Sequence, residues 1–489
     1  MTGSSQLRAP SRLDGLRGRV GTAVAGHWAR ARRARAVVRR EPFDVSTPEG
    51  RSNERYRRIA LNTLSRVAAR VVGAAVSLVS VPITLAYLGK AEYGLWAAIG
   101  SFTTWVALFD FGLVNGLVNA VSEAHGRDDR DAARSYVSTA LAVLVALALV
   151  MAATFAVALP LVPWARLFSA DAAVSERVVR WGVVAAVVPF LASLPLSIVR
   201  QVYAGYQKSY VVDLFSATAS LLSVAAMIHA VRADAGLPVL IAIAASAGGL
   251  GAAASFAVMT RVDLPWVAPR WGAASRTAAR RLLATSTPLF LFQLGALVVN
   301  ESQILILAHR SGLATVADYS IVMRLYVLVV SFIALGTGAF VPSFREAFER
   351  GEHDWLRRGF RRMLALRMTA ALAVAAVLLV VGNALLEVWL RSGAVRFPPA
   401  TWGALGVLLA VATWGSAYSE LLAILDRIWV QVGLVLVNGA CTAGLTYALA
   451  PRFGVLGALI AAALVPLALI SWVLPLVARP VLAPARARP

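Results

Sequence analysis

Apolar runs of about 20 residues recur along this chain from Ile59 to Ala478, and they constrain its fold more than any other feature. A helix needs about 20 apolar residues to cross the hydrocarbon core of a bilayer. Charged residues make up 15% of the chain, whereas they are about a quarter of a soluble globular protein. The alternating ten-residue strands of a membrane β-barrel are absent from the sequence. The chain is therefore predicted to be an all-α, polytopic membrane protein.

The apolar runs predict about twelve membrane-spanning helices, whose ends the sequence defines only to within a few residues. The predicted helices are 59–88, 94–122, 135–162, 179–204, 210–231, 237–260, 285–308, 316–342, 366–389, 400–425, 428–449 and 454–478.

Arginine and lysine are distributed unequally between the loops on the two sides of these helices. If the N-terminus lies in the cytoplasm, the inner loops hold 17 of these residues and the outer loops hold 9. Cytoplasmic loops of membrane proteins carry an excess of Lys and Arg. We therefore expect a bacterial cytoplasmic (inner) membrane protein with both termini in the cytoplasm. The net charge of +22 is mainly this topology signal, so it gives no reason to expect nucleic-acid binding.

The residues before the first apolar run form an Arg-rich arm with no acidic residue between Gly15 and Arg40. This segment is too charged to be the apolar part of a signal peptide. One interpretation is a disordered or amphipathic arm on anionic lipid headgroups, where each Arg contributes about 1 kcal/mol. The alternatives are docking to a cytoplasmic partner, such as a glycosyltransferase, and an organellar transit peptide.

An internal repeat organises the rest of the chain. Tyr93 and Tyr319 begin corresponding helices 226 positions apart, each preceded by a short polar segment that contains a glycine. Helices 1–6 and 7–12 are therefore predicted to be two pseudo-symmetric six-helix bundles in the same orientation. Parallel repeats of this kind build transporters whose substrate site lies between the halves.

The repeat divides the chain into five expected parts. They are a cytoplasmic arm at 1–58, a first lobe at 59–260, a basic cytoplasmic linker at 261–284, a second lobe at 285–478 and a cytoplasmic tail at 479–489.

Four arginines, Arg66, Arg70, Arg200 and Arg324, fall inside or at the edges of the predicted helices. A charge near the centre of the bilayer costs about 3 kcal/mol, so it marks a functional pathway by default. Positive charge along an internal path suggests a negatively charged cargo. For Arg66 and Arg70 the alternative is that their long side chains reach the inner headgroups. For Arg200, contact with headgroups or with Asp213 is the favoured interpretation.

Polar and small residues within several predicted helices recur every three or four positions, so they share one face of the helix. The first helix carries the longest such stripe, which is Asn62, Arg66, Arg70, Gly73, Ser77, Ser80 and Thr84. The side chains predicted to bind substrate in a shared central cavity are Arg66, Arg70, Asn115, Asn119, Asn300, Gln303 and Arg324. Helix packing is the alternative for the neutral positions, because small and hydroxyl residues also let helices approach each other.

Three carboxylates within the predicted helices, Asp110, Glu301 and Glu420, are candidates for binding a coupling ion. Asp110 lies on nearly the opposite helix face from Asn115 and Asn119. Neutralisation of a neighbouring arginine is therefore the alternative for Asp110.

The sequence gives no reason to expect a cofactor or a bound metal. Cys441 is the single cysteine, the five histidines are scattered, and no nucleotide-binding sequence of the GxxxxGK[ST] type is present. An ATPase is therefore not encoded within this chain.

Several segments resemble bacterial polysaccharide flippases of the O-antigen type, which belong to the multidrug/oligosaccharidyl-lipid/polysaccharide exporter superfamily. The segments that carry the resemblance are Asn62-Thr63-Leu64-Ser65-Arg66, Pro82-Ile83-Thr84-Leu85-Ala86-Tyr87-Leu88-Gly89, Tyr93-Gly94-Leu95-Trp96, Phe109-Asp110-Phe111-Gly112-Leu113, Ala204-Gly205-Tyr206-Gln207-Lys208, Ala317-Asp318-Tyr319-Ser320 and Arg324-Leu325. The similarity extends diffusely over about 55–478.

The resemblance implies a MATE-like fold and export of a polyprenyl-diphosphate-linked oligosaccharide to the outer leaflet, for cell-surface polysaccharide assembly. It also implies alternating access driven by a proton or sodium gradient or by membrane potential, with glycan-assembly proteins as possible partners. A cationic cavity meets the diphosphate in the family, and Arg66, Arg70 and Arg324 match that role. The chain departs from the family in its long arm and in helix 7, where Glu301 lies only near the usual acidic position.

Two other functional classes compete with this interpretation. A cation-coupled drug exporter of the same fold would favour carboxylates and aromatic side chains in its cavity. A membrane glycosyltransferase or polymerase commonly has long outer loops, whereas the longest here spans about Pro163 to Glu176. The sequence therefore favours a transporter over an enzyme.

Overall fold

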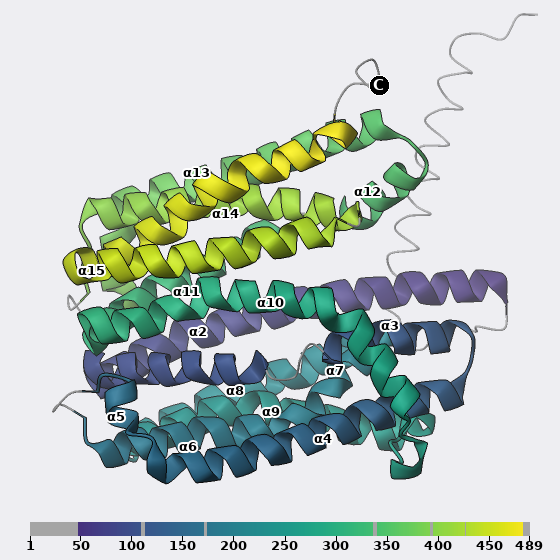
Figure 1. The fold of residues 1–489 in the computed structure, drawn as a ribbon, viewed down its shortest axis with the longest axis horizontal. Helices are drawn as coiled ribbons and strands as arrows, with labels where there is room; N and C mark the ends of the chain where they lie inside the picture. The colour runs from purple at the N-terminus through teal and green to yellow at the C-terminus, as the bar shows by residue number, and fades with distance from the viewer. Residues whose placement is uncertain are drawn as a thin grey trace, which may run out of the picture.

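The computed structural model is helical throughout the described part of the chain and contains no strand there (Figure 1). Most of the helices run side by side along the length of the molecule. The all-α prediction is thereby confirmed. The described residues are 47–108, 113–170, 174–335, 340–391, 395–425 and 427–482. The predicted arm up to residue 46, Asp110 and the tail from residue 483 lie outside them.

The first half of the chain forms a bundle that we call the first lobe. Its helices are α2 (Pro48–Ala107), α3 (Leu113–Gly126), α4 (Arg130–Leu161), α5 (Trp164–Leu167), α6 (Glu176–Ser193), α7 (Ile198–Gly205), α8 (Ser209–Arg232) and α9 (Leu237–Val258). A 3-10 turn at Leu194–Ser197 joins α6 to α7, and short π and 3-10 turns follow α9 between Met259 and Ala273.

The second half forms a corresponding bundle, the second lobe. Its helices are α10 (Arg276–Ser311), α11 (Leu313–Leu335), α12 (Phe340–Glu349), α13 (His353–Leu390), α14 (Pro399–Ile424) and α15 (Ile428–Leu482). The first turns of α10 extend onto α3 and α4 of the first lobe, whereas its later part packs on α15 (Figure 1).

Helices α2 and α15 are each two helices joined at a glycine. Gly89 has φ 71° and Gly454 has φ 51°, which lie in the left-handed region that glycine adopts most easily. Ten helices of the described part are long and apolar enough to cross a membrane. Because α2 and α15 each supply two crossings, these helices account for the twelve crossings predicted from the sequence.

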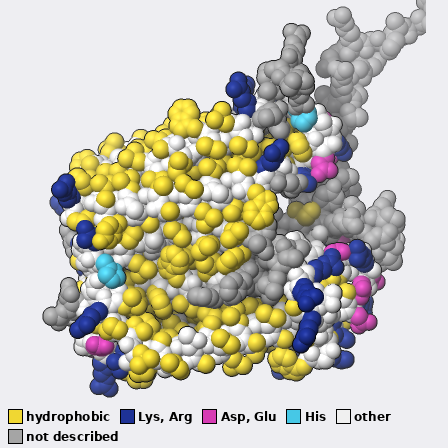
Figure 2. Space-filling view, viewed as in Figure 1, with side chains coloured by type: hydrophobic (Ala, Val, Ile, Leu, Met, Phe, Trp, Pro, Cys, Tyr) yellow, Lys and Arg dark blue, Asp and Glu magenta, His cyan; other side chains and the backbone are white. Residues whose placement is uncertain are grey.

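Side-chain chemistry divides the molecule into an apolar middle and two charged ends. In the face shown in Figure 2, hydrophobic side chains cover the middle, and Lys and Arg gather toward both ends. Such an apolar belt is what a bilayer requires of the protein surface. We call the end where α2 begins and α15 ends the terminal end, and the opposite end, with Gly89 and Gly454, the distal end.

Among the described residues, the first turns of α10 add Leu282 to the core of the first lobe, but the main hydrophobic cluster shared by the two lobes lies in the distal half. There one cluster includes Leu95 and Ile99 of the first lobe together with Leu307 and Tyr319 of the second. In the terminal half the described residues form two separate cores. The core of the first lobe includes Leu117, Val137, Ile198 and Tyr203, and that of the second includes Phe344, Phe360, Tyr418 and Leu421. The lobes are therefore packed together distally and divided near the terminal end.

Backbone proximity and an ion pair close the distal end. A Cβ atom built on Gly94 would lie 1.9 Å from the carbonyl oxygen of Leu313, so only glycine fits between α2 and α11 there. The Lys90 Nζ lies 2.9 Å from Oδ1 of Asp318 in the opposite lobe. These contacts hold the first turns of two repeat-related helices against each other.

A further link between the lobes depends on a proline. Pro82 has no N–H, so the carbonyl of Leu78, four residues earlier, lacks its usual helical partner. Trp389 Nε1 of α13 donates a hydrogen bond of 2.7 Å to that carbonyl. The proline in α2 of the first lobe thus leaves a carbonyl oxygen free, and a side chain of the second lobe donates a hydrogen bond to it.

Candidate functional site

A cavity of about 820 Å³ lies between the two lobes. Helices α2, α8 and α9 line it from the first lobe, and α10 and α11 line it from the second. The packed distal core closes the side of the cavity that faces the distal end. We call this space the central cavity.

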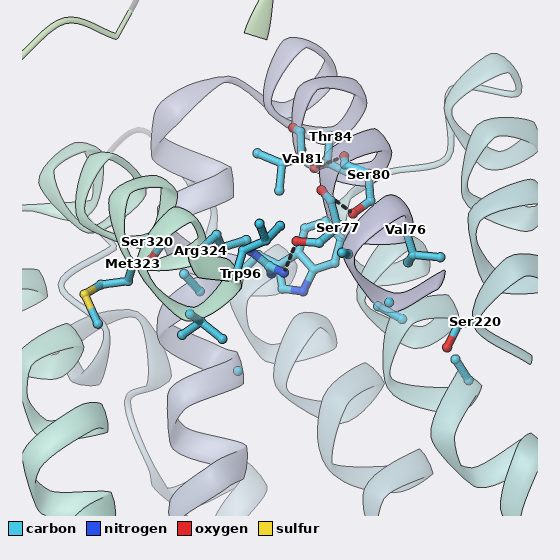
Figure 3. A pocket seen from close by; sticks show the side chains of 18 of the residues that line it. Val76, Ser77, Ser80, Val81, Thr84, Trp96, Ser220, Ser320, Met323 and Arg324 are labelled. Carbon is cyan, nitrogen blue, oxygen red and sulfur yellow. Dashed lines mark hydrogen bonds between the residues drawn. The ribbon is translucent and has the colours of Figure 1, made fainter. Parts of the chain in front are cut away.

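Two arginines of the central cavity reach from one lobe to the other. Arg324 of α11 points across the cavity and donates from Nη1 to Ser77 Oγ of α2 at 3.3 Å (Figure 3). Arg70 of α2 donates from Nη1 to the carbonyl oxygen of Ser331 of α11 at 3.4 Å. Charge-assisted hydrogen bonds are typically about 2.7–2.9 Å long, so both contacts are weak. Neither guanidinium forms an ion pair within the described part of the chain.

The stripe predicted on the first helix contributes much of the wall. From α2 the cavity is lined by Arg70, Gly73, Ser77, Ser80 and Thr84. The stripe lies on one face because these positions are three or four residues apart. Periodicity in the sequence therefore identified this part of the wall.

Glu301 of α10 lines the same cavity, together with the aromatic side chains of Tyr93 and Trp96. Its backbone carbonyl accepts a hydrogen bond of 3.0 Å from Ser101 Oγ across the lobes. The cavity therefore contains one carboxylate and two guanidinium groups among the described residues. This charge balance favours an anionic ligand.

Several predicted cavity residues lie elsewhere. Arg66 is on an exposed part of α2, and Asn119 is exposed on α3. Asn300 is exposed and donates its amide to its own helix, at 2.7 Å. Gln303 is buried and accepts a hydrogen bond of 2.6 Å from the hydroxyl of Tyr319. The central cavity as described is not lined by any of these four side chains, and the side chain of Asn115 lies outside the description.

Glu420 is engaged within the second lobe. Its Oε1 and Oε2 accept hydrogen bonds of 3.0 and 2.9 Å from Arg367 of α13. The Arg367 side chain is 2% exposed. The helix predicted over 366–389 would put Arg367 at its first turn, but α13 begins at His353 and buries this residue. In this bidentate ion pair the charges of Arg367 and Glu420 neutralise each other within the second lobe.

A buried row of polar side chains on α15 was not predicted from the sequence. Asn438, Thr442 and Thr446 are at most 3% exposed, and their side-chain oxygens have no hydrogen-bond partner in the described part of the chain. Their spacing of four residues puts them on one helix face, which was the available signal. The strongest packing of α15 is against α10, so this row lies inside the second lobe.

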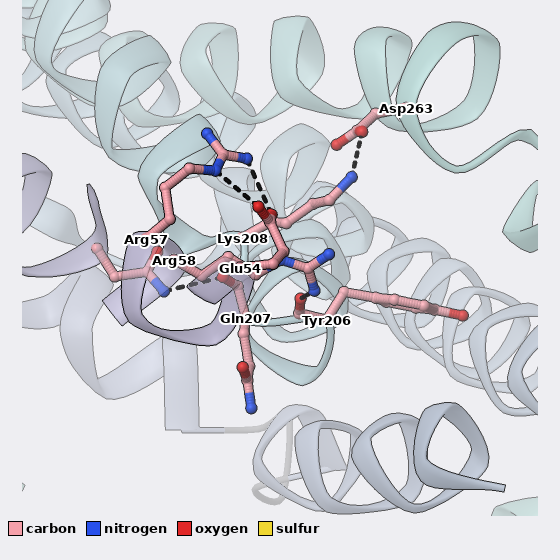
Figure 4. Close-up of polar contacts among 8 residues, drawn as sticks. Glu54, Arg57, Arg58, Tyr206, Gln207, Lys208 and Asp263 are labelled. Carbon is pink, nitrogen blue, oxygen red and sulfur yellow. Dashed lines mark hydrogen bonds and ion pairs between the residues drawn. The ribbon is translucent and has the colours of Figure 1, made fainter. Parts of the chain in front are cut away.

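Charged residues at the terminal end of the first lobe are largely paired with one another (Figure 4). Glu54, which is 3% exposed, accepts hydrogen bonds from Arg57 Nε at 2.8 Å and from Arg58 Nε at 3.0 Å. Lys208 pairs with Asp263. Arg58 Nη1 also donates to the carbonyl oxygen of Tyr206 at 3.4 Å, which attaches the start of α2 to the turn after α7. The positive charge of these side chains is therefore engaged at the terminal end.

Partial burial lowers the pKa of the nearby His125, and the positive charges of Arg58 and Lys208 act in the same direction. The imidazole is therefore neutral near pH 7 and adds no charge at this end. The described residues contain no group of three or more His, Cys, Asp or Glu that could hold a metal ion.

Comparison with known proteins adds evidence on the family and the fold. The family model described as polysaccharide biosynthesis protein matches residues 59–348. No curated protein sequence matches the chain significantly.

Among solved structures, an inward-facing multidrug resistance MATE transporter of the MOP superfamily has a TM-score of 0.69 at 15% identity, covering 85% of this chain and 97% of its own. The lipid II flippase MurJ in an inward closed conformation has a TM-score of 0.62 at 11% identity, covering 86% and 87%. An outward-facing MATE transporter has a TM-score of 0.55 at 16% identity, covering 84% and 94%. At these identities the likeness shows the shared fold alone.

Proposed function

Because this chain belongs to the polysaccharide biosynthesis protein family, we propose that it is a flippase for a polyprenyl-diphosphate-linked oligosaccharide. It would export this lipid across the bacterial cytoplasmic membrane by alternating access, for assembly of cell-surface polysaccharide. One observation carries the proposal, namely that Arg70 and Arg324 face one cavity from opposite lobes without an ion-pair partner among the described residues.

Physical chemistry explains why such a pair suits a diphosphate. Moving a diphosphate across about 30 Å of hydrocarbon requires that its hydration be replaced by fixed charge and polar groups. Arginine presents planar N–H donors that match phosphate oxygens bidentately. Since one arginine comes from each lobe, a bound diphosphate would stabilise a specific distance between the lobes. Substrate binding and the rocking of the lobes are coupled in this way.

The closed distal end supports an inward-facing assignment, with the terminal end in the cytoplasm. A headgroup would then enter the central cavity from the cytoplasmic leaflet while its polyprenyl tail stays in the bilayer. In this proposal the lobes are 59–260 and 285–478, and the basic segment 261–284 connects them. Glu301 is the favoured site for a coupling proton or sodium ion, because it shares the cavity with the arginines.

The alternative function is export of a cationic drug or other small molecule. Glu301, Tyr93 and Trp96 favour it, because a carboxylate beside aromatic rings suits an organic cation. The two arginines oppose it by repulsion. The glycan proposal explains both arginines and is therefore preferred.

The test is transport by the purified full-length protein in proteoliposomes. Arg70→Gln and Arg324→Gln are each expected to slow flipping of a fluorescent diphosphate-linked glycan at least about tenfold, because a hydrogen bond to a charged group contributes about 1.5–3 kcal/mol. Arg66→Gln, which removes an exposed arginine from the same helix, is the matched control and should stay within about twofold. Export of a cationic dye without any glycan flipping would support the alternative function instead.

A further inference from the structure

A second cavity of about 600 Å³ lies inside the first lobe, between α2, α6, α7, α8 and α9. It adjoins the central cavity along a shared wall of Trp96, Gly100, Thr104 and Ala244. A Cβ atom built on Gly100 would meet nothing within 4 Å, so the wall is thin and open at that point. We call this space the first-lobe chamber. The proposed diphosphate site does not use it.

Hydroxyl oxygens on the chamber wall are free to accept hydrogen bonds. Thr103, Thr104, Ser193 and Ser197 each donate their O–H to a carbonyl of their own helix, at 2.7–3.0 Å. A hydroxyl that donates in this way keeps lone pairs for acceptance. The amide of Gln201 also lines the chamber. Such a wall can accept hydrogen bonds from a solute with many O–H groups, although most of its other lining residues are apolar.

The terminal end of the chamber presents a guanidinium group. The Arg200 side chain is 57% exposed, with Nη1 3.6 Å from Asp213 Oδ1 and Nη2 3.5 Å from Ser216 Oγ. Both distances exceed the range of about 2.7–2.9 Å for charge-assisted hydrogen bonds. The Asp213 side chain is only 10% exposed and accepts a hydrogen bond of 3.1 Å from Ser65. The chamber therefore faces the cation rather than its carboxylate partner.

We infer that the first-lobe chamber receives the sugars of the lipid-linked substrate and that Arg200 binds a carboxylate carried by one of them. The preferred cargo is then a glycan containing a hexuronic acid. This inference rests on the proposed function, because it seats the diphosphate on Arg70 and Arg324 and the sugars in the adjoining space. A volume of about 600 Å³ lies within the range of about 300–1,000 Å³ for small-molecule sites. Arginine can hold a carboxylate with two parallel N–H donors.

The transport arm of the test uses two lipid-linked glycans that differ only in one sugar, a neutral hexose or the corresponding hexuronic acid. Arg200→Gln in the full-length protein is expected to slow flipping of the acidic glycan at least about tenfold and to leave the neutral glycan within about twofold. The matched control is Arg232→Gln, which removes an exposed arginine at the far end of α8. Arg324→Gln should slow both glycans. Equal effects of Arg200→Gln on the two glycans, or no effect on either, would overturn the inference.

A binding arm separates this inference from the proposed function. Soluble acidic and neutral oligosaccharides without lipid or diphosphate are compared by saturation-transfer NMR on the purified protein. We expect binding of the acidic oligosaccharide that Arg200→Gln abolishes and Arg232→Gln preserves. If the wild type flips neither lipid but still shows this Arg200-dependent binding, the proposed function fails and the chamber assignment stands. Equal binding of the acidic and neutral oligosaccharides, or binding that Arg200→Gln leaves unchanged, would overturn the assignment.

Discussion

The arginines on the helices of this protein differ in what balances their charge. Arg367 is held bidentately by Glu420, and Arg57 is held by Glu54, so both contribute to local structure. Among the described residues, Arg70 and Arg324 contact a carbonyl oxygen and hydroxyl groups, including that of Tyr93, and no carboxylate. An unbalanced charge in an apolar setting is costly unless a ligand neutralises it. The pairing of a charge, rather than its presence, is therefore the reason to propose Arg70 and Arg324 as substrate-binding arginines.

Removal of one partner of the Arg367–Glu420 pair tests this distinction. Arg367→Met is expected to destabilise the protein by about 3 kcal/mol, because it leaves Glu420 uncompensated. The double variant Arg367→Met with Glu420→Met should lose less stability than Arg367→Met alone, since no charge remains unpaired. Thermal unfolding of the purified protein in detergent measures both. A double variant that is less stable than Arg367→Met would show that the pair stabilises the lobe beyond charge compensation.

Helix α2 contains a proline that allows a hydrogen bond between the two lobes. Pro82 frees the carbonyl of Leu78, and Trp389 of α13 occupies it. A helix without this proline would offer no acceptor at this position, because the carbonyl would bond within the helix. The bond must break if the lobes separate at the distal end. Under the proposed alternating access, it would therefore contribute to the free-energy difference between inward-facing and outward-facing states.

Trp389→Phe is expected to shift the protein toward the outward-facing state by about 1 kcal/mol, which is the typical net contribution of one hydrogen bond. In a Pro82→Ala background the same substitution should have a smaller effect, because Leu78 then has a helical partner. Electron-electron distance measurements between spin labels at the distal ends of α2 and α11 report the two populations. Trp472→Phe, at an exposed site, is the control. An equal shift with and without Pro82 would contradict the role given to the proline.

Among the described residues, one large core joins the two lobes in the distal half, whereas the terminal half has a separate core in each lobe. Gly94 is central to this asymmetry, because α2 and α11 approach each other there more closely than any side chain allows. Alternating access requires that this contact open while the terminal half closes. Under the proposed function, the strength of the contact would then set the fraction of the protein that faces inward.

Gly94→Ala is expected to increase access to the central cavity from the outer side severalfold, because its Cβ would overlap the backbone of Leu313. The measurement is the rate at which an impermeant thiol reagent, added to intact cells, labels a cysteine introduced by Ser77→Cys. The single native cysteine is removed by Cys441→Ser. Gly73→Ala lines the same cavity but has open space around its Cβ, so it should leave labelling unchanged. Unchanged labelling in Gly94→Ala, at normal protein level, would contradict the closed distal contact.

The membrane class, the twelve crossings and the two-lobe repeat could all be predicted from the amino-acid sequence. The polar stripe of α2 could be predicted in the same way, as could Arg70 and Arg324 as candidate substrate-binding residues. These features depend on composition and on periodicity along single helices, which are local properties of the chain. The same reasoning grouped Arg66, Asn300 and Gln303 with them, because it cannot tell which helix a given face meets.

Only the tertiary structure decided which polar groups are already satisfied. Gln303 bonds to Tyr319, and Glu420 bonds to Arg367. The predicted contact of Arg200 with Asp213 is present at 3.6 Å, while the Arg200 side chain also lines the first-lobe chamber. These outcomes depend on contacts between helices distant in sequence, and partner atoms within about 3–4 Å determine them. A charge can be read from the sequence, whereas its neutralisation depends on packing.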